Sequence, residues 1–551
     1  MMQMKKKIIA VFGILLLLFV LIVGIQIEKR HSQNKIKTFT AFFSVLGEPR
    51  DEENEIKKLI AQKTGASCEE IWLTGQTADT AIASYIASGK YPDFISGDAE
   101  LLKAGALIPI DEYWDDYPNI KNYMSEKEWE LFRQEDGHIY WIPQFGVAKG
   151  ESSDVIHEGE AFWIQTRVLK WAGYPQIHTV REYFELLEDY YNANPVAENG
   201  QPNIPFTILC DDWRFFCLEN PPQFLDGYPN DGCCIVDPVR KKVIDYNMSL
   251  TAKRYFRLLN QEYRKGMIDP ESFVQTYEEY LEKLSTGCVL GMVDQWWQFA
   301  YNINDSLESV DIEGGNYVPL PITIDKGIKN KWHVKRGSEI NTSDGISITI
   351  NCEDIPGAMQ FINDLMDEEI MKLRFWGVEN VDYHVDEHGR FYRTKNQRTK
   401  AGDAIQKSSH FCSYAYFPRW EGKLSDKINA FAPEYQPNDF YATCPEDVKE
   451  CLAAYGCSTY VDMIGTNDEP GVWYPMYSYT DTLTADTTEG EVMDRLDQVK
   501  HNYLPQVIMS QDFDSTWESY TEQYHACNPD ILYGALQKEL IRRLDQSEQA
   551  E

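Results

Sequence analysis

The stretch from Ser343 to Phe391 begins Gly345-Ile346-Ser347-Ile348-Thr349-Ile350, in which apolar and polar residues alternate. This period of two predicts a half-buried strand. Asp354 and Pro356 then predict a helix start, because aspartate caps helices and proline is tolerated in a first helical turn. One helix face is predicted from apolar residues at three- and four-residue steps: Met359, Ile362, Leu365, Met366 and Leu373. A strand and helix this late in a long chain indicate either a domain that the chain leaves and re-enters, or an ordinary strand–helix unit.

The size and charge of the chain limit what it can be. Its 551 residues exceed the length at which one hydrophobic core stops growing, so two or more lobes are expected. The hydrophobic content of 43% is that of a globular protein with ample core. The net charge of -35 argues against nucleic acid and against an anionic membrane surface as partners.

The N-terminal segment predicts the compartment. Three lysines at positions 5–7 precede an apolar run from Ile8 to Ile25. This run is close to the roughly 20 residues that span a bilayer and longer than the roughly 7–15 of a signal peptide. Neither an Ala-x-Ala site nor a cysteine for lipidation follows it, since the first cysteine is Cys68. We expect an uncleaved anchor, with a cleaved signal as the alternative, and with everything after Glu28 outside the cell.

The cysteines and acidic loops give little sign of a metal site. There are 12 cysteines, an even number that permits disulfides in an exported chain. Cys444, Cys451 and Cys457 lack the spacing of a zinc site. Buried thiols and one or two bridges both stay open as interpretations. The acidic loop Asn467-Asp468-Glu469-Pro470 lacks calcium-loop spacing, so calcium there also stays open, and no cofactor is expected.

Strands and helices alternate from the beginning of the exported part. Strands are predicted at Thr38–Phe43 and Cys68–Leu73, and a helix at Ala78–Ser88. This alternation predicts an α/β fold with a parallel sheet that helices cover on both faces.

Several motifs then occur in an order typical of one family. They are Ala-Ser-Gly-Lys-Tyr-Pro-Asp-Phe-Ile at Ala87–Ile95, Leu-Ile-Pro-Ile-Asp-Glu-Tyr at Leu107–Tyr113, and the segments Arg264–Phe273 and Phe375–Tyr383. The ordered set resembles bacterial extracellular solute-binding proteins of family 1, the carbohydrate-capture subunits of ABC importers. The resemblance covers nearly all residues from Thr38 onward. The chain departs from the lipoprotein-type members because it has no cysteine to acylate near its N-terminus.

The resemblance implies a two-lobed periplasmic-binding-protein-like fold of class II with discontinuous domains. Ligands of open α/β sheets bind at the carboxyl ends of the strands, and lobes close around them by hinge motion. The expected division is a cytoplasmic tail (1–7), an anchor or signal segment (8–27), a tether (28–37), lobe 1 (38–148), lobe 2 (149–335), a return segment of lobe 1 (336–392), and the completion of lobe 2 with C-terminal helices (393–551).

Aromatic residues beside polar groups just after strands are the first site candidates. Sugars present flat CH faces to aromatic rings and hydroxyls to carboxylates, amides and arginine. The strand-like runs Pro205–Leu209 and Gly291–Val293 each lead into such a group. In the family resemblance, the position after the second run is an aromatic of the cleft. We expect Trp296 or Trp297 to be a platform, the other to be core, and Asp294 to accept a sugar hydroxyl. The second group is Asp212, Trp213 and Arg214, for which a capped helix with a packed tryptophan is the alternative.

Further candidates follow other predicted strands and loops. Gln76 and Asp98 follow strands of the first lobe, and Asp98 is alternatively a helix cap. Trp141 and Gln144 border the crossing segment, and Trp376 follows the return helix. Exposed packing aromatics are the alternative for the second-lobe loops that carry Arg419, Trp420 and Trp473.

We therefore predict an extracytoplasmic binding subunit of an ABC importer that captures an oligosaccharide and delivers it to membrane permeases. It is expected to be a monomer at the outer face of the membrane and not an enzyme. The chain has no Gly-x-Ser-x-Gly, His-Glu-x-x-His or Walker-type loop. The alternatives are a glycan hydrolase, whose carboxylate pair a sequence cannot show, and a ligand-sensing ectodomain of a membrane receptor.

Overall fold

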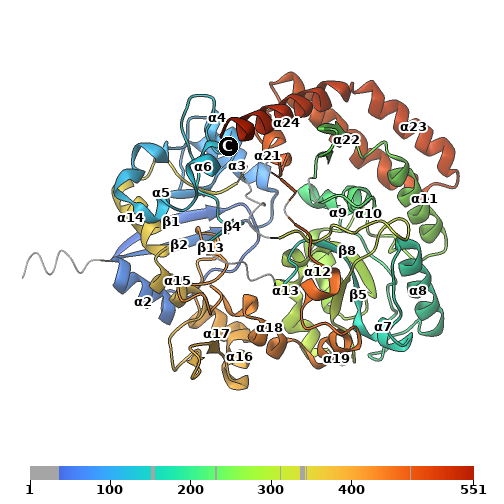
Figure 1. Ribbon diagram of the computed structural model, residues 1–551, viewed down its shortest axis with the longest axis horizontal. Helices are drawn as coiled ribbons and strands as arrows, with labels where there is room; N and C mark the ends of the chain where they lie inside the picture. Colours follow the sequence, from blue (N-terminus) through green and yellow to red (C-terminus); the bar gives the residue numbers. More distant parts are fainter. Residues whose placement is uncertain are drawn as a thin grey trace, which may run out of the picture.

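The computed structural model describes residues 36–149, 155–229, 232–310, 312–335, 342, 344–468, 470–471 and 473–550. The predicted tail, the anchor and most of the tether lie outside these residues. Figure 1 shows two lobes, one built on the N-terminal strands in blue and one on the green central part of the chain. No helix among the described residues is long and apolar enough to cross a membrane.

The first lobe contains a four-stranded sheet in the order β10-β3-β1-β2. Strand β1 (Lys37–Phe43) is parallel to β2 (Ala66–Trp72) and to β3 (Phe94–Ser96), as the alternation of strands and helices predicts. Its helices are α2 (Glu55–Thr64), α3 (Ala78–Ser88), α4 (Ala99–Lys103), α5 (Pro118–Lys121) and α6 (Glu126–Glu130), with short 3-10 turns at Ile110–Glu112 and Trp114–Asp116.

The stretch that opens the sequence analysis does return to the first lobe. Strand β10 (Ile346–Ile348) pairs antiparallel with β3, and the Asp354 side chain caps the next helix at Gly357 N. The predicted single helix is in fact two, α14 (Ile355–Leu365) and α15 (Glu368–Phe375). It breaks because Asp367 caps α15 through Glu369 N, which ends the first helix and starts the second.

The second lobe is built on an antiparallel sheet in the order β8-β5-β9. Its strands are β5 (Glu160–Gln165), β8 (Gly291–Gln295) and β9 (Tyr317–Leu320). The predicted strand at 205–209 makes only isolated bridges, such as Thr207 with Met292. The remaining elements are α7 (Thr166–Trp171), α8 (Val180–Ala193), η3 (Asp212–Phe215), α9 (Phe216–Glu219), α10 (Pro221–Leu225), β6 (Ile235–Asp237), β7 (Lys242–Ile244), α11 (Leu250–Arg264), α12 (Tyr277–Ser285) and α13 (Trp296–Ser309).

Two segments that pass between the lobes, at 155–157 and 333–334, lie beside residues 461–467 of the second lobe. His157 Nδ1 and His333 Nδ1 are 3.1 Å apart, and Val334 bridges to Asn467. Val461 N donates to Val155 O. Buried apolar side chains of the two lobes form one continuous cluster, so the lobes are in contact in this conformation.

Residues 393–430 contact the first lobe. Asn54 Nδ2 donates to the carbonyls of Ser408 and Phe411, and Trp376 Nε1 donates to Ala430 O. Strand β13 (Trp420–Glu421) pairs with β4 (Val147–Ala148). These contacts favour a boundary after Ala430 in place of the predicted one at 392/393. Before residue 393 the chain forms β11 (His384–Val385) and β12 (Phe391–Tyr392), and the helices after it are α16 (Lys395–Gly402) and α17 (Ala404–Ser409).

The C-terminal part packs on the second lobe. Helix α22 (Thr488–Met509) lies against α11 and α23 (Phe513–Ala526), and α24 (Asp530–Ala550) packs against β7. Figure 1 shows these helices in red along the outer side of the green lobe. Preceding them are η4 (Pro433–Tyr435), α18 (Pro437–Thr443), α19 (Glu446–Ala454), α20 (Tyr460–Ile464) and α21 (Tyr477–Thr480).

Ten of the cysteines are free thiols in the structure, which favours the interpretation of buried thiols over that of bridges for these ten: Cys68, Cys210, Cys217, Cys288, Cys352, Cys412, Cys444, Cys451, Cys457 and Cys527. Burial raises the pKa of thiols such as Cys352, to about 12, so they behave as small apolar residues.

Candidate ligand-binding site between the lobes

A strained turn positions the first group of candidate residues. Asp212 has a left-handed backbone with φ of 53°, which is uncommon outside glycine and tolerated best by Asn and Asp. It begins η3, which carries Trp213 and Arg214. Asp211 Oδ2 accepts Tyr277 N at 3.0 Å, so the start of α12 is held beside this turn. We call Asp212, Trp213, Arg214, Tyr277 and Trp297 the Arg214 site.

Two tryptophans from the two predicted groups form one aromatic surface. The rings of Trp213 and Trp297 have centroids 6.0 Å apart and an interplanar angle of 14°. Trp213 is 41% exposed, and Trp297 is held at the start of α13 by a hydrogen bond from its Nε1 to Gln295 Oε1. Such a flat, partly exposed pair is the kind of surface on which a sugar ring packs.

Arg214 lies beneath this surface without a polar partner. Its guanidinium carbon is 4.4 Å from the ring centroid of Trp213 and 4.0 Å from that of Tyr277. The residue is only 7% exposed, and its Nε is buried without a hydrogen bond. None of the described residues accepts a hydrogen bond from this side chain. Within the part of the chain that the structure describes, the N–H donors of this guanidinium are therefore without acceptors.

The first lobe faces the Arg214 site. Burial raises the pKa of Asp212, and the carboxylate of Asp79, on α3 of the first lobe, raises it further. Burial also raises the pKa of Tyr416, in the first-lobe segment 393–430, to about 12, while the positive charges of Arg419 and Arg214 lower it. Since these groups influence one another through space, the Arg214 site lies where the lobes meet.

A groove on α22 opens beside this site. Its volume is about 520 Å³. His501 of this groove lies on the Phe215 ring, with centroids 3.9 Å apart. Burial lowers the pKa of His501, and Asp212 is among the acids that oppose this shift. The groove follows α22 and is lined by Asp494, Asp497, Gln498, His501 and Asn502.

Of the two first-lobe residues predicted to bind ligand, Gln76 lies in an exposed loop and Asp98 lies at the start of a helix. Gln76 is exposed in the loop between β2 and α3, three residues before Asp79. Asp98 caps α4, because its Oδ1 accepts Glu100 N at 2.8 Å and Leu101 N at 3.1 Å. This cap is the alternative that the sequence left open for Asp98. Burial raises the pKa of Asp98, and the negative charge of Asp79 raises it further.

Asp294 is not placed to accept a sugar hydroxyl, contrary to expectation. It is 0% exposed, and its carboxylate accepts Tyr280 Oη, Gln298 Nε2 and Gln295 N, each at 2.7 Å. The side chain holds β8 to the helices beside it. Its neighbour Trp296 packs partly on the core, with Tyr301 edge-on at 4.7 Å, so Trp297 is the tryptophan of this pair that lies in the Arg214 site.

The structure also buries most of the other predicted residues. Trp141 donates to Thr342 O, Trp376 to Ala430 O, and Trp420 to Met366 O. These three, with Trp473 and Gln144, are at most 5% exposed. In this conformation they are core side chains, because their rings and amide are enclosed by protein. Arg419 lies over Phe145 at 4.8 Å and near Glu421, so it joins first-lobe segments.

Sequence reasoning missed Asp79, Tyr277, Tyr416 and His501. Tyr277 follows Thr276, whose capping box with Glu279 predicts a helix start, but nothing in the sequence places it against Arg214. The other three reach the site from α3, from segment 393–430 and from α22, which only the tertiary fold brings together.

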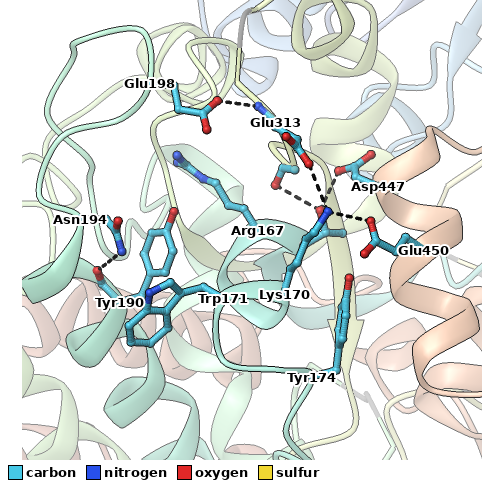
Figure 2. Close-up of a pocket in the computed structure, with 12 residues that line it drawn as sticks. Arg167, Lys170, Trp171, Tyr174, Tyr190, Asn194, Glu198, Glu313, Asp447 and Glu450 are labelled. Atoms are coloured by element: carbon cyan, nitrogen blue, oxygen red, sulfur yellow. Dashed lines mark hydrogen bonds and ion pairs between the residues drawn. The ribbon is translucent and has the colours of Figure 1, made fainter.

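A second cavity of about 220 Å³ lies at the other end of the second-lobe sheet (Figure 2). It begins at Thr166, after the last residue of β5, whereas the Arg214 site lies near the β5 start, where Glu160 pairs with Gln295. In Figure 2, Lys170 bridges Glu313 and Glu450, at 3.1 and 2.8 Å. No residue predicted to bind ligand lines this cavity.

Metal binding has no structural support in the described residues, where no group of three or more His, Cys, Asp or Glu could hold an ion. In the acidic loop considered for calcium, Asp468 pairs with Lys335 at 2.9 Å, and Glu469 lies outside the described residues.

Comparisons with known proteins place the fold. No family model matches the chain, and no curated protein matches its sequence. Among solved structures, it is similar to the Streptococcus pneumoniae ABC-transporter substrate-binding protein FusA in complex with kestose, with a TM-score of 0.62, 20% identity, and coverage of 94% of this chain and 100% of that one. The chain has the two-lobed solute-binding-protein fold.

Two further solved structures have the same fold. The alginate-binding protein AlgQ2 matches with a TM-score of 0.62 and 16% identity over 92% of this chain and 98% of that one. An HMO-binding, ABC-transporter-associated solute-binding protein from Bifidobacterium longum infantis matches with a TM-score of 0.59 and 15% identity, again over 92% and 98%. The structural neighbours are thus sugar-binding proteins of ABC transporters, and at these identities they show the fold alone.

Proposed function

We propose that this protein is the extracytoplasmic solute-binding subunit of an ABC importer and that it captures a carbohydrate, an oligosaccharide, between its lobes. The observation that carries the proposal is the stacked, exposed Trp213–Trp297 surface beside Asp212 and Arg214, at the point where the lobes meet. Aromatic faces next to hydrogen-bonding groups are what a sugar ring requires.

The mechanism is capture followed by closure. A sugar face packs on Trp213 and Trp297 while its hydroxyls bind to polar side chains of both lobes. Closure about the adjacent crossing segments at 155–157 and 333–334 then removes the ligand from water. The closed form docks on membrane permease subunits, and the protein acts as a monomer held at the outer face of the membrane by its N-terminal segment, or released if that segment is cleaved.

Catalysis is not part of the proposal. The carboxyls of Asp294 and Glu160 are enclosed by protein, with exposures of 0% and 1%, and cannot reach a glycosidic bond in this conformation. A hydrolase would release product from an oligosaccharide, so the absence of product after long incubation with a bound glycan separates binding from hydrolysis.

The direct test is ligand binding to the exported part of the chain. A bound oligosaccharide is expected to raise Tm by mass action and to change tryptophan fluorescence through Trp213 and Trp297. If a panel of malto-, cello-, xylo-, manno- and fructo-oligosaccharides with their uronate counterparts changes neither signal, the proposed function is wrong. Co-purification with a histidine kinase in place of permease subunits would instead favour a sensing ectodomain.

A further inference from the structure

Arg214 is unusual because it is buried and stacked, and no residue in the described ranges accepts a hydrogen bond from it. Its exposed fraction is 7%, and two rings lie within 4.4 Å of its guanidinium carbon. An arginine has five N–H donors, and burying them without acceptors costs free energy. The cation–π contacts with Trp213 and Tyr277 offset part of this cost and fix the plane of the guanidinium.

The nearest acid has a complementary arrangement. Asp212 precedes the arginine by two positions, at the strained backbone of η3. No side chain of the described residues donates a hydrogen bond to its carboxylate. The same turn thus presents donors of Arg214 that no described residue accepts, and an Asp212 carboxylate bonded only to the backbone at Trp213, next to the aromatic surface.

The charges around this pair are mostly negative. Asp79 faces Asp212 from the first lobe, and Asp211 is adjacent in the chain. Across the interface, Asp344 lies near Asp98 and Asp481, and burial raises the pKa of Asp344 to about 7. A carboxylate placed on Arg214 would be attracted by one guanidinium but repelled by the acids on both sides.

We propose that Arg214 and Asp212 together bind two neighbouring hydroxyls of an uncharged sugar, and that the site binds neutral oligosaccharides more tightly than acidic ones. The inference rests on the proposed function. The guanidinium donates two parallel hydrogen bonds to the hydroxyl oxygens, and the Asp212 carboxylate accepts a hydroxyl proton. Trp213 and Trp297 pack on the flat face of the same ring.

The test uses calorimetric titration with the tri- to pentasaccharide that gives the largest Tm shift in the neutral panel, and with the matched oligouronate. Wild-type protein is expected to bind the neutral sugar at least about tenfold more tightly. Arg214→Lys keeps the charge but loses the planar fork, so it is expected to lose about tenfold or more in affinity with Tm of the ligand-free protein unchanged. Arg254→Lys, an exposed arginine paired with Asp325, is the matched control and should bind as wild type.

Asp212→Asn tests the charge separately. It removes one negative charge and is expected to narrow the preference for the neutral sugar. The inference is overturned if Arg214→Lys binds as tightly as wild type, or if the uronate binds more tightly than the neutral sugar. If wild-type protein binds neither class, the proposed function fails, and the inference fails with it, an outcome distinct from the other two.

Discussion

Two buried arginines of this protein have opposite surroundings. Arg374, on α15 of the first lobe, is 2% exposed and donates to five backbone carbonyls at 2.7 to 3.1 Å: Leu365, Ser413, Tyr414, Phe417 and Pro418. Arg214 is 7% exposed and has no acceptor among the described residues. Burial lowers the pKa of Arg374 to about 9. Both residues are stacked on aromatic rings, so the difference lies in hydrogen bonding.

This difference in hydrogen bonding indicates that Arg374 supports the fold and that Arg214 binds a ligand. Four of the five carbonyls belong to segment 413–418, which therefore wraps around Arg374 and makes this arginine a part of the core. A folded protein rarely leaves a buried donor unused, and such exceptions call for an explanation. For Arg214, the explanation that fits its place between the lobes is a ligand.

The largest expected effect is that of Arg374→Ala. It removes the side-chain donor of five carbonyls, of which Tyr414 O keeps a bond from Phe417 N, and should lower the free energy of unfolding by about 3–5 kcal/mol. Thermal or urea unfolding measures this loss, with Arg254→Ala as the exposed control. A Tm close to that of wild type would remove the structural role assigned to Arg374.

The next effect concerns pH and Asp294, an acid as fully hydrogen-bonded as Arg374. Burial raises the pKa of Asp294 to about 7, despite the donors that lower it. Between its ordinary value of 3.8 and about 7, the folded state holds a proton that the unfolded state releases, so stability falls as pH rises. From pH 5 to pH 8 the stability of wild type relative to Asp294→Asn should fall by on the order of 2 kcal/mol. A pH-independent difference would show that the carboxyl is already ionised at pH 5.

Removing one half of the aromatic surface should weaken binding without unfolding the protein. Trp297→Ala leaves Trp213 without its stacked partner, and affinity for the bound oligosaccharide should fall about tenfold, or about 1.4 kcal/mol. Trp171→Ala is the matched control, because Trp171 is 49% exposed but lies at the second cavity. Equal losses of affinity in both variants would show that Trp297 is not part of the surface on which the sugar packs.

Arg214→Met should have a small effect of opposite sign on the ligand-free protein. Replacing an unpaired buried cation by an apolar side chain of similar length is expected to leave stability unchanged or to raise it by up to about 1 kcal/mol. Differential scanning calorimetry of the ligand-free protein measures this. A loss of several degrees in Tm would mean that Arg214, like Arg374, supports the fold.

The smallest expected effect is that of the exposed ion pair between Lys103 on α4 and Asp486 before α22, at 3.0 Å. This pair joins the lobes, but exposed pairs contribute little and salt screens them. Lys103→Ala should therefore change Tm by less than the error of the measurement at 0.15 M salt. A clear, salt-dependent drop would identify the pair as a real contributor to closure.

Cap residues, glycines and the spacing of apolar residues predicted many of the helices and strands. The bounds of α3 agree with expectation, since Thr77 caps its start and Gly89 adopts the left-handed conformation at its end. The break between α14 and α15 was missed because the apolar period continues through Met366, and Asp367 reads as one more polar position. The sequence analysis named Trp213, Arg214 and Trp297, but their stacking joins elements far apart in the chain.

Burial separates the predicted site residues that lie in the Arg214 site from those that the structure encloses in this conformation. Trp141, Trp376 and Asp294 have the right residue types after predicted strands or helices, but the fold encloses them. Residue type and position after a strand are the same for an aromatic in the core and one at the lobe interface. The difference depends on which segments cover the residue, and for Trp376 the covering residue, Ala430, is 54 positions away.

The near-parallel indoles of Trp213 and Trp297 also give the molecule a spectroscopic signature. Two identical chromophores at this separation couple their electronic transitions, which produces a paired positive and negative band in circular dichroism when the two transition dipoles are skewed to one another. A ligand that contacts either ring and changes its orientation would change the amplitude of this pair of bands. Occupancy could then be followed optically, without a label.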